Sequence, residues 1–538
     1  MAKKIFYEQE AREKILSGAK KLHDAVKVTY GPKGQNVVIE KSYGAPTITH
    51  DGVTVAEAVE LENDDEKLGE QIGAKLIKTA AQKLNKAAGD GTTTVTVLTY
   101  NILNEANKLI AAGINPMELR KGIEKAGKEV VKAIDKQAEK IEGDDKKVAE
   151  VATISAGDEK IGKLIADVIS KIGKDGVVTV EAGQGLEMEQ EIVEGYSYDK
   201  GYSSPFFITD TNRQEAISEK PAILITDKKV SSSSEILPLL EQCAQAGKKD
   251  LVIIAEEVSG EALSLLVLNK LKGAFNAIVL KAPAFGDRRK EIMEDIAILT
   301  DATVVSEDKG LKLEEAGLEV LGSAAKVLAT RDETTIIKGA GDKKAVAART
   351  ELIKSQASLA TSDYERGEFE KRAAALEGKV AVIKVGGATE TEIDEKKFRV
   401  DDAVAATKAA LSEGIVTGGG VTLLNIEKTI KPDTDGAKIV KNALKAPFIT
   451  IMENAGLNAQ ALLAEVESAK DGQGINVMEP EKGLQDLKKA GVIDPAKVTR
   501  EAVQNAISIA ATAITMGALI CDIPEKADAQ PAADMGMY

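Results

Sequence analysis

One short segment of the chain combines residue types that suit phosphate chemistry. Residues 87–94 read AAGDGTTT, which sets Asp90 between Gly89 and Gly91 and follows it with a run of threonines. The glycines allow a sharp turn and a close approach of the backbone to a ligand. The run after the turn predicts a helix, whose first N–H groups would face an anion. Because a carboxylate beside phosphates needs a bridging cation, the segment indicates a nucleotide with Mg²⁺ held at Asp90.

The same segment has a simpler interpretation as an ordinary helix start with Asp90 as its N-cap. It is not a Walker A loop, because no G-x-x-x-x-G-K-[ST] sequence occurs there. On spacing alone the two interpretations are about equally favoured. Other segments must decide between them.

Several segments elsewhere in the chain could complete such a site. They are the turn Tyr30-Gly31-Pro32 in VTYGPKGQNVV, Asp51 in THDGV, Asp402 in FRVDDAVAA at an expected helix start, and the glycines 418–420 that open another helix. Taken one at a time, each is better explained as a turn, a cap or tight packing.

Length and composition indicate a large globular protein. With 538 residues the chain should form two to four domains. Aromatic residues make up only 3% and Trp is absent, so Ala, Val, Ile and Leu must build the core. A net charge of −15 argues against nucleic acid as the main ligand. The two cysteines and two histidines fit no zinc or redox spacing, and a structural disulfide is not expected.

The ends of the chain carry no targeting or membrane signal. The N-terminal segment MAKKIFYEQEAREKIL lacks an apolar signal core. The longest apolar run, AISIAATAITMGALI, is shorter than a membrane span and predicts a buried helix. These features predict a cytoplasmic protein without a membrane partner.

The pattern of elements changes along the chain and returns. Both ends are helical in texture, and the middle alternates short apolar strands with helices, as in an α/β domain. This order predicts a mainly helical base from residues 1–137 and 412–538, a small α/β connecting domain from 138–194 and 379–411, and an inserted α/β domain from 195–378. We expect residues 525–538 to be disordered. Gly195 and Gly378 lie at the expected junctions and could serve a hinge, although ordinary turn glycines are the simpler interpretation.

Together the motifs carry a family resemblance over about residues 2–525. The chain closely resembles the large subunit of the bacterial group I chaperonins, the GroEL type. The segments that carry the resemblance are VTYGPKGQNVV, GAPTITHDGVTV, AAGDGTTTVTVL, KAPAFGDRRK, EKKFRVDDA and the triple glycine. The resemblance implies equatorial, intermediate and apical domains with the boundaries given above. It also implies an ATPase that is coupled to protein folding and that assembles into two stacked seven-membered rings. Such ATPases are classed as isomerases and take part in the stress response.

The resemblance also assigns roles to residues of the helical base. It implies that the nucleotide contacts Thr29, Tyr30, Gly31, Pro32, Asp90, Gly91, Thr92, Thr93, Thr94, Gly419, Asn476 and Asp494. Asp90 would hold Mg²⁺, with K⁺ as an aid. Asp402 would orient or deprotonate the attacking water with help from Asp51, which fits phosphoryl transfer because that reaction needs little beyond positioning, a metal and an oriented water.

In the inserted domain the resemblance implies an apolar surface that captures non-native client proteins and a small lid-like co-chaperonin ring. The residues concerned are Tyr202, Phe206, Phe207, Leu237, Leu240, Leu263, Val267 and Leu268. Without the resemblance, core packing would be the favoured interpretation of all of them. Exposed apolar surface would explain promiscuous capture, because every unfolded chain displays such surface.

Two other classes of function compete with a chaperonin. A metabolic kinase would turn over ATP only with a specific acceptor, and a structural ring would bind ATP without hydrolysis. The sequence also departs from the resembled family at His50, at Gly378-Lys379 and in its short C-terminal segment, EKADAQPAADMGMY. No nucleotide role is therefore assigned to His50.

Overall fold

The structure is a computed structural model that describes residues 2–40, 46–62, 67–173, 176–183, 185–211, 213–360 and 362–523. The predicted disorder of residues 525–538 lies outside these described residues. Internal contacts divide the chain into two compact units. Unit 1 comprises residues 1–174, 180–188 and 385–538, and unit 2 comprises residues 175–179 and 189–384.

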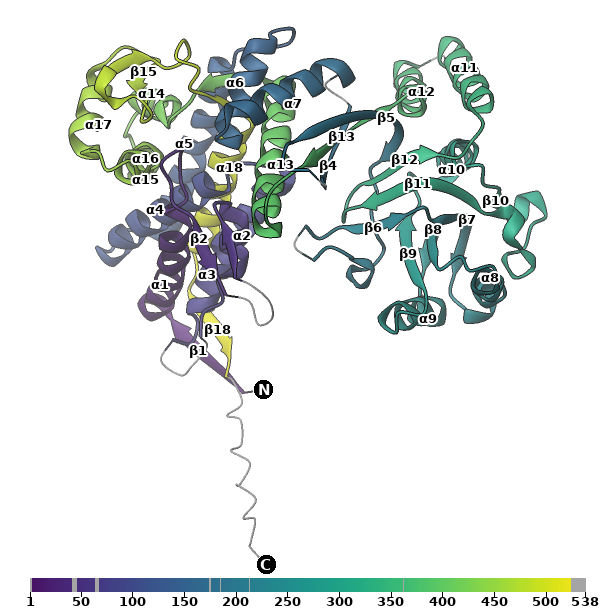
Figure 1. Ribbon diagram of the computed structural model, residues 1–538. Helices are drawn as coiled ribbons and strands as arrows, with labels where there is room; N and C mark the ends of the chain where they lie inside the picture. Colours follow the sequence, from purple (N-terminus) through teal and green to yellow (C-terminus); the bar gives the residue numbers. More distant parts are fainter. Residues whose placement is uncertain are drawn as a thin grey trace, which may run out of the picture. The chain divides into compact units, whose positions relative to one another are not determined.

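Unit 1 is mainly helical and is built from both ends of the chain (Figure 1). Its helices are α1 (Glu8–Lys27), α2 (Gly52–Ala58), α3 (Glu70–Ala88), α4 (Thr92–Ala111), α5 (Pro116–Gln137), α6 (Asp145–Ala156), α7 (Glu159–Ile172), α13 (Glu390–Glu413), α14 (Val421–Thr429), α15 (Asp435–Ala443), α16 (Ala446–Asn454), α17 (Ala459–Ser468) and α18 (Ala496–Ala513).

Short antiparallel strand pairs complete unit 1. They are β1 (Lys3–Tyr7) with β18 (Ala518–Asp522), β2 (Val37–Ile39) with β3 (Thr47–Thr49), β14 (Ile415–Thr417) with β17 (Ile493–Pro495), and β15 (Gln473–Ile475) with β16 (Leu484–Asp486). Strand β4 (Val177–Ala182) begins in unit 2 and ends in unit 1.

The core of unit 1 follows the predicted helical periodicity. In α1 the residues Ile15, Ala19, Leu22 and Val26 are all buried, as their spacing on one face predicts. Ala19, Leu22 and Val26 share a core with α3, α4, α5 and α18, while Ile15 packs in a smaller cluster with Phe6 and Leu519. Because α18 comes from the C-terminal part of the chain, the predicted helical base from both termini is confirmed. Its core is rich in small aliphatic residues, which the low aromatic content predicts.

Unit 2 is an α/β domain around a mixed sheet. Its strands are β5 (Glu189–Tyr198), β6 (Ala216–Glu219), β7 (Ala222–Val230), β8 (Asp250–Val258), β9 (Asn276–Lys281), β10 (Val304–Val305), β11 (Gly322–Ala329), β12 (Thr334–Gly339) and β13 (Lys379–Val385). Along the sheet the order is β13-β5-β12-β11-β7-β8-β9, with β10 beside β7 and β6 beside β11.

Helices connect and cover the strands of unit 2. They are α8 (Ser233–Gln245), α9 (Gly260–Leu271), α10 (Gly286–Thr300), α11 (Lys343–Leu359) and α12 (Asp363–Leu376), with a short 3-10 turn, η1, at Pro205–Phe207. Strands β7, β8 and β9 run parallel, so α8 and α9 are the crossovers that such strands need. The four residues Ile223, Leu224, Ile253 and Ile254 at the centre of β7 and β8 are fully buried.

The glycines predicted at a hinge lie in a packed part of unit 2. The N–H of Gly195 donates to the carbonyl of Gly378 at 3.2 Å. A Cβ atom added to Gly195 would lie 2.3 Å from the side chain of Val380. Close packing therefore accounts for Gly195, while the three-domain division and its hinge remain predictions.

Candidate functional site

The segment with alternating glycines forms an uncapped helix start. Helix α4 begins at Thr92, and its N-cap is Gly91 with a φ of 83°, a conformation that favours glycine. No side chain caps this end. The carboxylate of Asp90 instead accepts a hydrogen bond from the N–H of Gly91 and another from Ser155 Oγ at 3.1 Å. The simpler interpretation, with Asp90 as N-cap, is therefore wrong, and the helix end is left open to an anion.

The turn at Tyr30 lies directly against this helix start. Tyr30 Oη and Thr94 Oγ1 are hydrogen bonded at 2.7 Å, and the hydroxyls of Thr29 and Thr93 lie 3.4 Å apart. Gly31 has a φ of 80°, as a tight turn at that position requires. Two motifs separated by some sixty residues in the sequence thus meet at one place.

Sequence reasoning missed two residues that hold these parts in place. Asn454 Nδ2, at the end of α16, donates to the carbonyls of Lys27 and Tyr30 at 2.8 and 2.9 Å. These two hydrogen bonds hold the turn at Tyr30 in place. The sequence carries no indication of this role, because asparagine is common at helix ends. Ser155 lies near the end of α6, and only its contact with Asp90 reveals it.

Asp51 caps a second helix beside the threonines. Its carboxylate accepts from the N–H groups of Val53 and Thr54 at 3.0 and 2.9 Å, so Asp51 is the N-cap of α2. A Cβ added to Gly52 would lie 2.4 Å from Thr93 Oγ1. The cap interpretation is confirmed for Asp51, and the same contacts bring its carboxylate next to the start of α4.

Asp402 lies in the middle of α13, so the prediction that it opens a helix is wrong. The charged stretch before it is also helical, supported by pairs one turn apart such as Glu392 with Lys396. One turn after Asp402, the helix touches the glycine turn. A Cβ added to Gly89, whose φ is 70°, would lie 2.2 Å from Ala405 Cβ. The glycine is therefore required for α13 to approach as closely as it does.

The triple glycine forms a second uncapped helix start. Gly420 is the N-cap of α14 with a φ of 77°, and no side chain caps it. A Cβ added to Gly418 would lie 3.1 Å from Asp494 Oδ1, which places Asp494 on β17 beside these glycines. Gly419 also has a positive φ, 66°. Asn476 follows β15, and its carboxamide oxygen accepts from the N–H of Met478 at 3.0 Å. A contact of Asn476 with a base remains a prediction.

Asp51, Asp90, Asp402 and Asp494 form what we call the carboxylate cluster. Burial raises the pKa of Asp402 well above its usual range, and the nearby carboxylates of Asp51 and Asp90 raise it further. Burial also raises the pKa of Asp90, against the hydrogen bonds from Gly91 and Ser155. Burial and the charge of Asp90 raise the pKa of Asp494 to about 7. All four residues keep partial solvent exposure, as an open site requires.

Neighbouring carboxylates of like charge favour a cation between them. Among the described residues, no group of three or more His, Cys, Asp or Glu side chains is arranged to hold a metal ion. The protein alone therefore offers too few ligands for a dedicated metal cage. That donor set fits Mg²⁺, which binds one or two carboxylates together with substrate phosphates and water.

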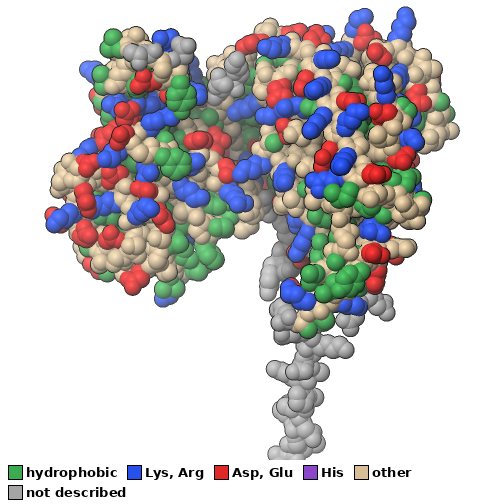
Figure 2. Space-filling model, turned by 180° about the vertical axis from the view of Figure 1, so that it is seen from behind, with side chains coloured by type: hydrophobic (Ala, Val, Ile, Leu, Met, Phe, Trp, Pro, Cys, Tyr) green, Lys and Arg blue, Asp and Glu red, His purple; other side chains and the backbone are tan. Residues whose placement is uncertain are grey.

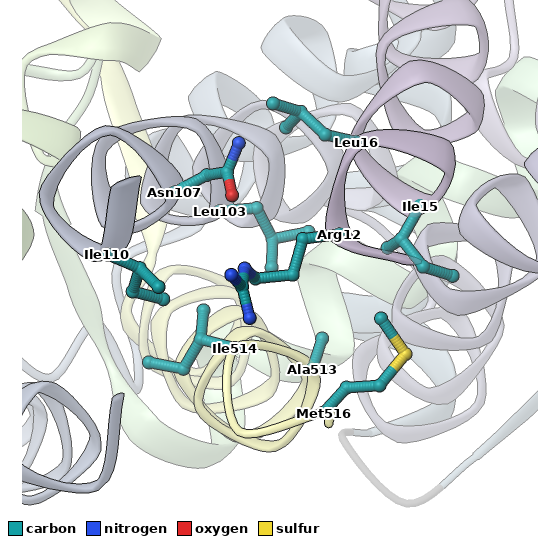
Figure 3. A pocket seen from close by; sticks show the side chains of 9 residues that line it. All are labelled: Arg12, Ile15, Leu16, Leu103, Asn107, Ile110, Ala513, Ile514 and Met516. Atoms are coloured by element: carbon teal, nitrogen blue, oxygen red, sulfur yellow. The ribbon is translucent and has the colours of Figure 1, made fainter. Parts of the chain in front are cut away.

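A separate apolar hollow lies elsewhere in unit 1 (Figure 3). It is a shallow hollow, open on one side, between α1, α4 and α18, and Arg12 and Asn107 are the polar residues beside it. None of the predicted nucleotide residues lines it. The predicted phosphate site therefore lies at the open helix starts and does not include this hollow.

In unit 2 the predicted capture residues divide by exposure. Phe206, Leu237 and Leu268 are 64%, 42% and 50% exposed, and Leu263 and Val267 are half-buried against the core. Tyr202, Phe207 and Leu240 are buried in that core. These last three side chains offer no surface to a client, so core packing describes them.

The exposed predicted residues form a patch with one residue that the sequence prediction left out. Leu271 at the end of α9 is 72% exposed. Figure 2 shows hydrophobic side chains gathered at the lower edge of this unit, where Figure 1 places α9. We call Phe206, Leu237, Leu268 and Leu271 the apolar patch.

The fold is that of a chaperonin. A crystal structure of the chaperonin gp146 from bacteriophage EL 2 (Pseudomonas aeruginosa), in the presence of ATP-BeFx, matches with a TM-score of 0.68. The match covers 97% of this chain and 99% of that chain at 20% sequence identity. Residues 22–524 also match the TCP-1/cpn60 chaperonin family. The chain therefore belongs to that chaperonin family. Among the described residues, the helices include none with the length and apolarity needed to cross a membrane.

Proposed function

We propose that the chain is a subunit of an ATP-dependent chaperonin of the bacterial group I type. The observation that carries the proposal is the carboxylate cluster between two uncapped, glycine-led helix starts, α4 and α14. Two open N-termini suit a polyanion, and the carboxylates suit its metal counter-ion. The phage chaperonin of the same fold was crystallised with ATP-BeFx, which supports ATP as the nucleotide.

The residues of unit 1 would divide the work on the phosphates. The N–H groups and hydroxyls of Thr92, Thr93 and Thr94 would donate to phosphate oxygens. Asp90 would hold Mg²⁺, which when bound would neutralise charge that develops on those oxygens. Tyr30, fixed by Asn454, would keep the hydroxyl of Thr94 oriented. A role for K⁺ remains a prediction.

Asp402 would position the attacking water and accept its proton. Its raised pKa makes the carboxylate a stronger base than an ordinary aspartate, as proton abstraction from water requires. Asp51 raises that pKa by its charge, while its own oxygens already cap α2. Asp51 would thus assist chiefly through its charge, as a neighbour of the base.

The apolar patch of unit 2 would capture non-native chains and then a small co-chaperonin. Its members protrude from a well-packed core, so they can present apolar surface without loss of the fold. Apolar contact has no directional requirement, which suits clients of unrelated sequence. The co-chaperonin and the cytoplasmic location remain predictions from the sequence.

Two-stranded sheets of unit 1 that expose apolar side chains support assembly into rings. The pair β1–β18 exposes Ile5, Tyr7 and Ile520, and the pair β2–β3 exposes Val38 and Ile48. Two-stranded sheets with open edges are marginal alone and tend to pair with another chain. Ile520→Asp should therefore shift the protein toward smaller species in sedimentation, whereas the same change at exposed Leu352 on α11 should not.

The central test is Asp402→Ala in the full-length protein. We expect nucleotide affinity to change little and ATP turnover to fall by about 10²- to 10⁴-fold, the usual contribution of a positioned base. Calorimetric titration with ADP and Mg²⁺ measures binding, and phosphate release measures turnover. The matched control is Asp394→Ala, which removes a carboxylate from an exposed part of the same helix and should leave turnover unchanged.

The same experiment separates the competing functions. A kinase would turn over ATP only after a small acceptor is added, whereas a chaperonin should turn it over with no acceptor. A structural ring would release no phosphate even in the unchanged protein. Equal turnover in Asp402→Ala and in the unchanged protein would remove Asp402 from the proposed mechanism.

A further inference from the structure

Lys270 joins the two segments that carry most of the apolar patch. It lies on α9, between Leu268 and Leu271, and its Nζ donates to the carbonyl oxygen of Phe207 at 2.6 Å. Phe207 belongs to η1 and is buried, while its neighbour Phe206 in the same turn is 64% exposed. One cationic side chain therefore ties the exposed ring of Phe206 to the exposed leucines of α9.

The surroundings of Lys270 are unusual for a lysine. Its amine lies over the ring of Phe207, 5.8 Å from the centroid. Within the part of the chain that the structure describes, Lys270 forms no ion pair with a carboxylate. A half-buried ammonium without a counter-ion costs free energy, so the hydrogen bond to the Phe207 carbonyl is what retains it there.

We infer that Lys270 is a positioning residue of the apolar patch, whose ammonium holds the Phe207 carbonyl and thereby fixes the presentation of Phe206. This inference rests on the proposed function, because it assumes that the patch captures clients. Lys270 would act through Phe206 and would itself contact no client. The bond runs from charged donor to carbonyl, and such bonds are about twice as strong as neutral ones.

The charge of the Lys270 ammonium can be titrated near physiological pH. Burial alone lowers the pKa of Lys270 to about 8. The elements packed on α9 are η1, α8 and β9. Their titratable side chains are Glu235, Glu241 and Cys243 on α8 and Lys281 on β9, and on α9 itself Glu261. None of these alters the pKa of Lys270, so the ammonium is lost as pH rises through about 8.

The test compares client capture by the full-length protein with Lys270→Arg and Lys270→Met between pH 7 and pH 9. The probe is chemically denatured citrate synthase, and light scattering on dilution measures its aggregation. The arginine keeps its charge over this range. We expect the unchanged protein to match Lys270→Arg at pH 7 and to approach Lys270→Met at pH 9, with several-fold weaker capture.

Comparing the three proteins at the same pH excludes any effect of pH on the aggregation of the client itself. Parallel curves for the unchanged protein and Lys270→Arg would overturn the inference, as would full capture by Lys270→Met at pH 7. Thermal denaturation shows whether Lys270→Met unfolds unit 2, and in that case the arginine comparison decides alone. Absence of capture by the unchanged protein at pH 7 would instead refute the proposed function.

Discussion

The carboxylate cluster of unit 1 and the apolar patch of unit 2 are specified in different ways. Around the cluster, backbone conformation is decisive. Gly91 and Gly420 have positive φ and begin α4 and α14, and Gly89 has positive φ where α3 ends. Around the apolar patch, neighbouring residues of the same type differ strongly in exposure. Leu266 and Leu268 lie on the same helix, yet one is 1% exposed and the other 50%. Polar sites are thus fixed by local chain geometry, and apolar surfaces by what packs behind them.

The largest effect is expected at Gly89, where both the backbone conformation and the close packing require glycine. Gly89→Ala places a Cβ 2.2 Å from Ala405 at a φ of 70°, so α13 must move away from the glycine turn. We expect a loss of about 2–4 kcal/mol in unfolding free energy together with a large loss of ATP turnover. Thermal unfolding without nucleotide and phosphate release measure the two effects.

A matched glycine separates backbone strain from the packing clash. Gly113 has a φ of 95°, but nothing lies within 4 Å of its added Cβ. Gly113→Ala should therefore cost only the strain, about 1–2 kcal/mol, with turnover intact. Adding Ala405→Gly to Gly89→Ala should restore part of the lost turnover. Equal behaviour of the two alanine variants would show that the contact with α13 is unimportant.

A pair of substitutions on α9 sharpens the contrast inside unit 2. Leu266→Ser should destabilise the unit by about 3–5 kcal/mol, because it leaves a cavity and an unpaired hydroxyl in the core. Leu268→Ser should change stability by less than about 0.5 kcal/mol while client capture weakens several-fold. Thermal denaturation and aggregation suppression report the two properties. A stable Leu266→Ser protein, or normal capture by Leu268→Ser, would contradict the division between core and patch.

The pKa of Asp494 makes the stability of unit 1 depend on pH. A carboxyl group whose pKa is raised from 3.8 to about 7 binds its proton more tightly in the folded state. Its contribution is therefore lost as pH rises from about 4 to about 7, by at most about 4 kcal/mol and less with solvent contact. Relative to the unchanged protein, Asp494→Asn should gain melting temperature between pH 5 and pH 8 without nucleotide.

Asp486 supplies a control of opposite sign for that experiment. Hydrogen bonds from Lys489 lower the pKa of Asp486. The melting temperature of Asp486→Asn should therefore fall relative to that of the unchanged protein as the pH rises through the range in which Asp486 ionises. If both variants shift in the same direction, burial is not what sets the behaviour of Asp494.

The smallest effect is expected at the hydroxyl of Tyr30. Tyr30→Phe removes the 2.7 Å hydrogen bond with Thr94 and leaves the ring in place. A loss of about 1 kcal/mol corresponds to roughly fivefold weaker binding of ADP with Mg²⁺ in calorimetric titration. Tyr7→Phe, at a residue 62% exposed, serves as the control. Unchanged affinity in Tyr30→Phe would show that the hydroxyl does not orient Thr94.

The sequence predicts much of unit 1 because its motifs have local causes. Gly89 and Gly91 around Asp90, and Gly419 and Gly420 before Val421, have positive φ, and the helices that follow have clear periodicity. The sequence predicts a helix start at Asp402, whereas α13 begins at Glu390. Ion pairs between residues i and i+4 stabilise the helix through the charged stretch before Asp402. Asn454 and Ser155 were missed since their roles depend on contacts between segments far apart in the chain.

In unit 2 the sequence predicts the α/β texture but not which apolar residues face outward. Tyr202, Phe207 and Leu240 carry the same pattern as Phe206 and Leu237, and only the sheet and helices behind them decide their burial. Lys270 gave no signal for a similar reason, because its partner is a backbone carbonyl that no side-chain type reveals.

The amide of Asn454 makes the turn at Tyr30 sensitive to deamidation. Both carbonyls that it holds are acceptors, and the nitrogen is the atom that serves them. Slow hydrolysis of this amide would put an aspartate there, which has no proton to offer and would repel both oxygens. A single deamidation would then remove both hydrogen bonds that hold the loop of Tyr30, in protein whose fold is otherwise unchanged.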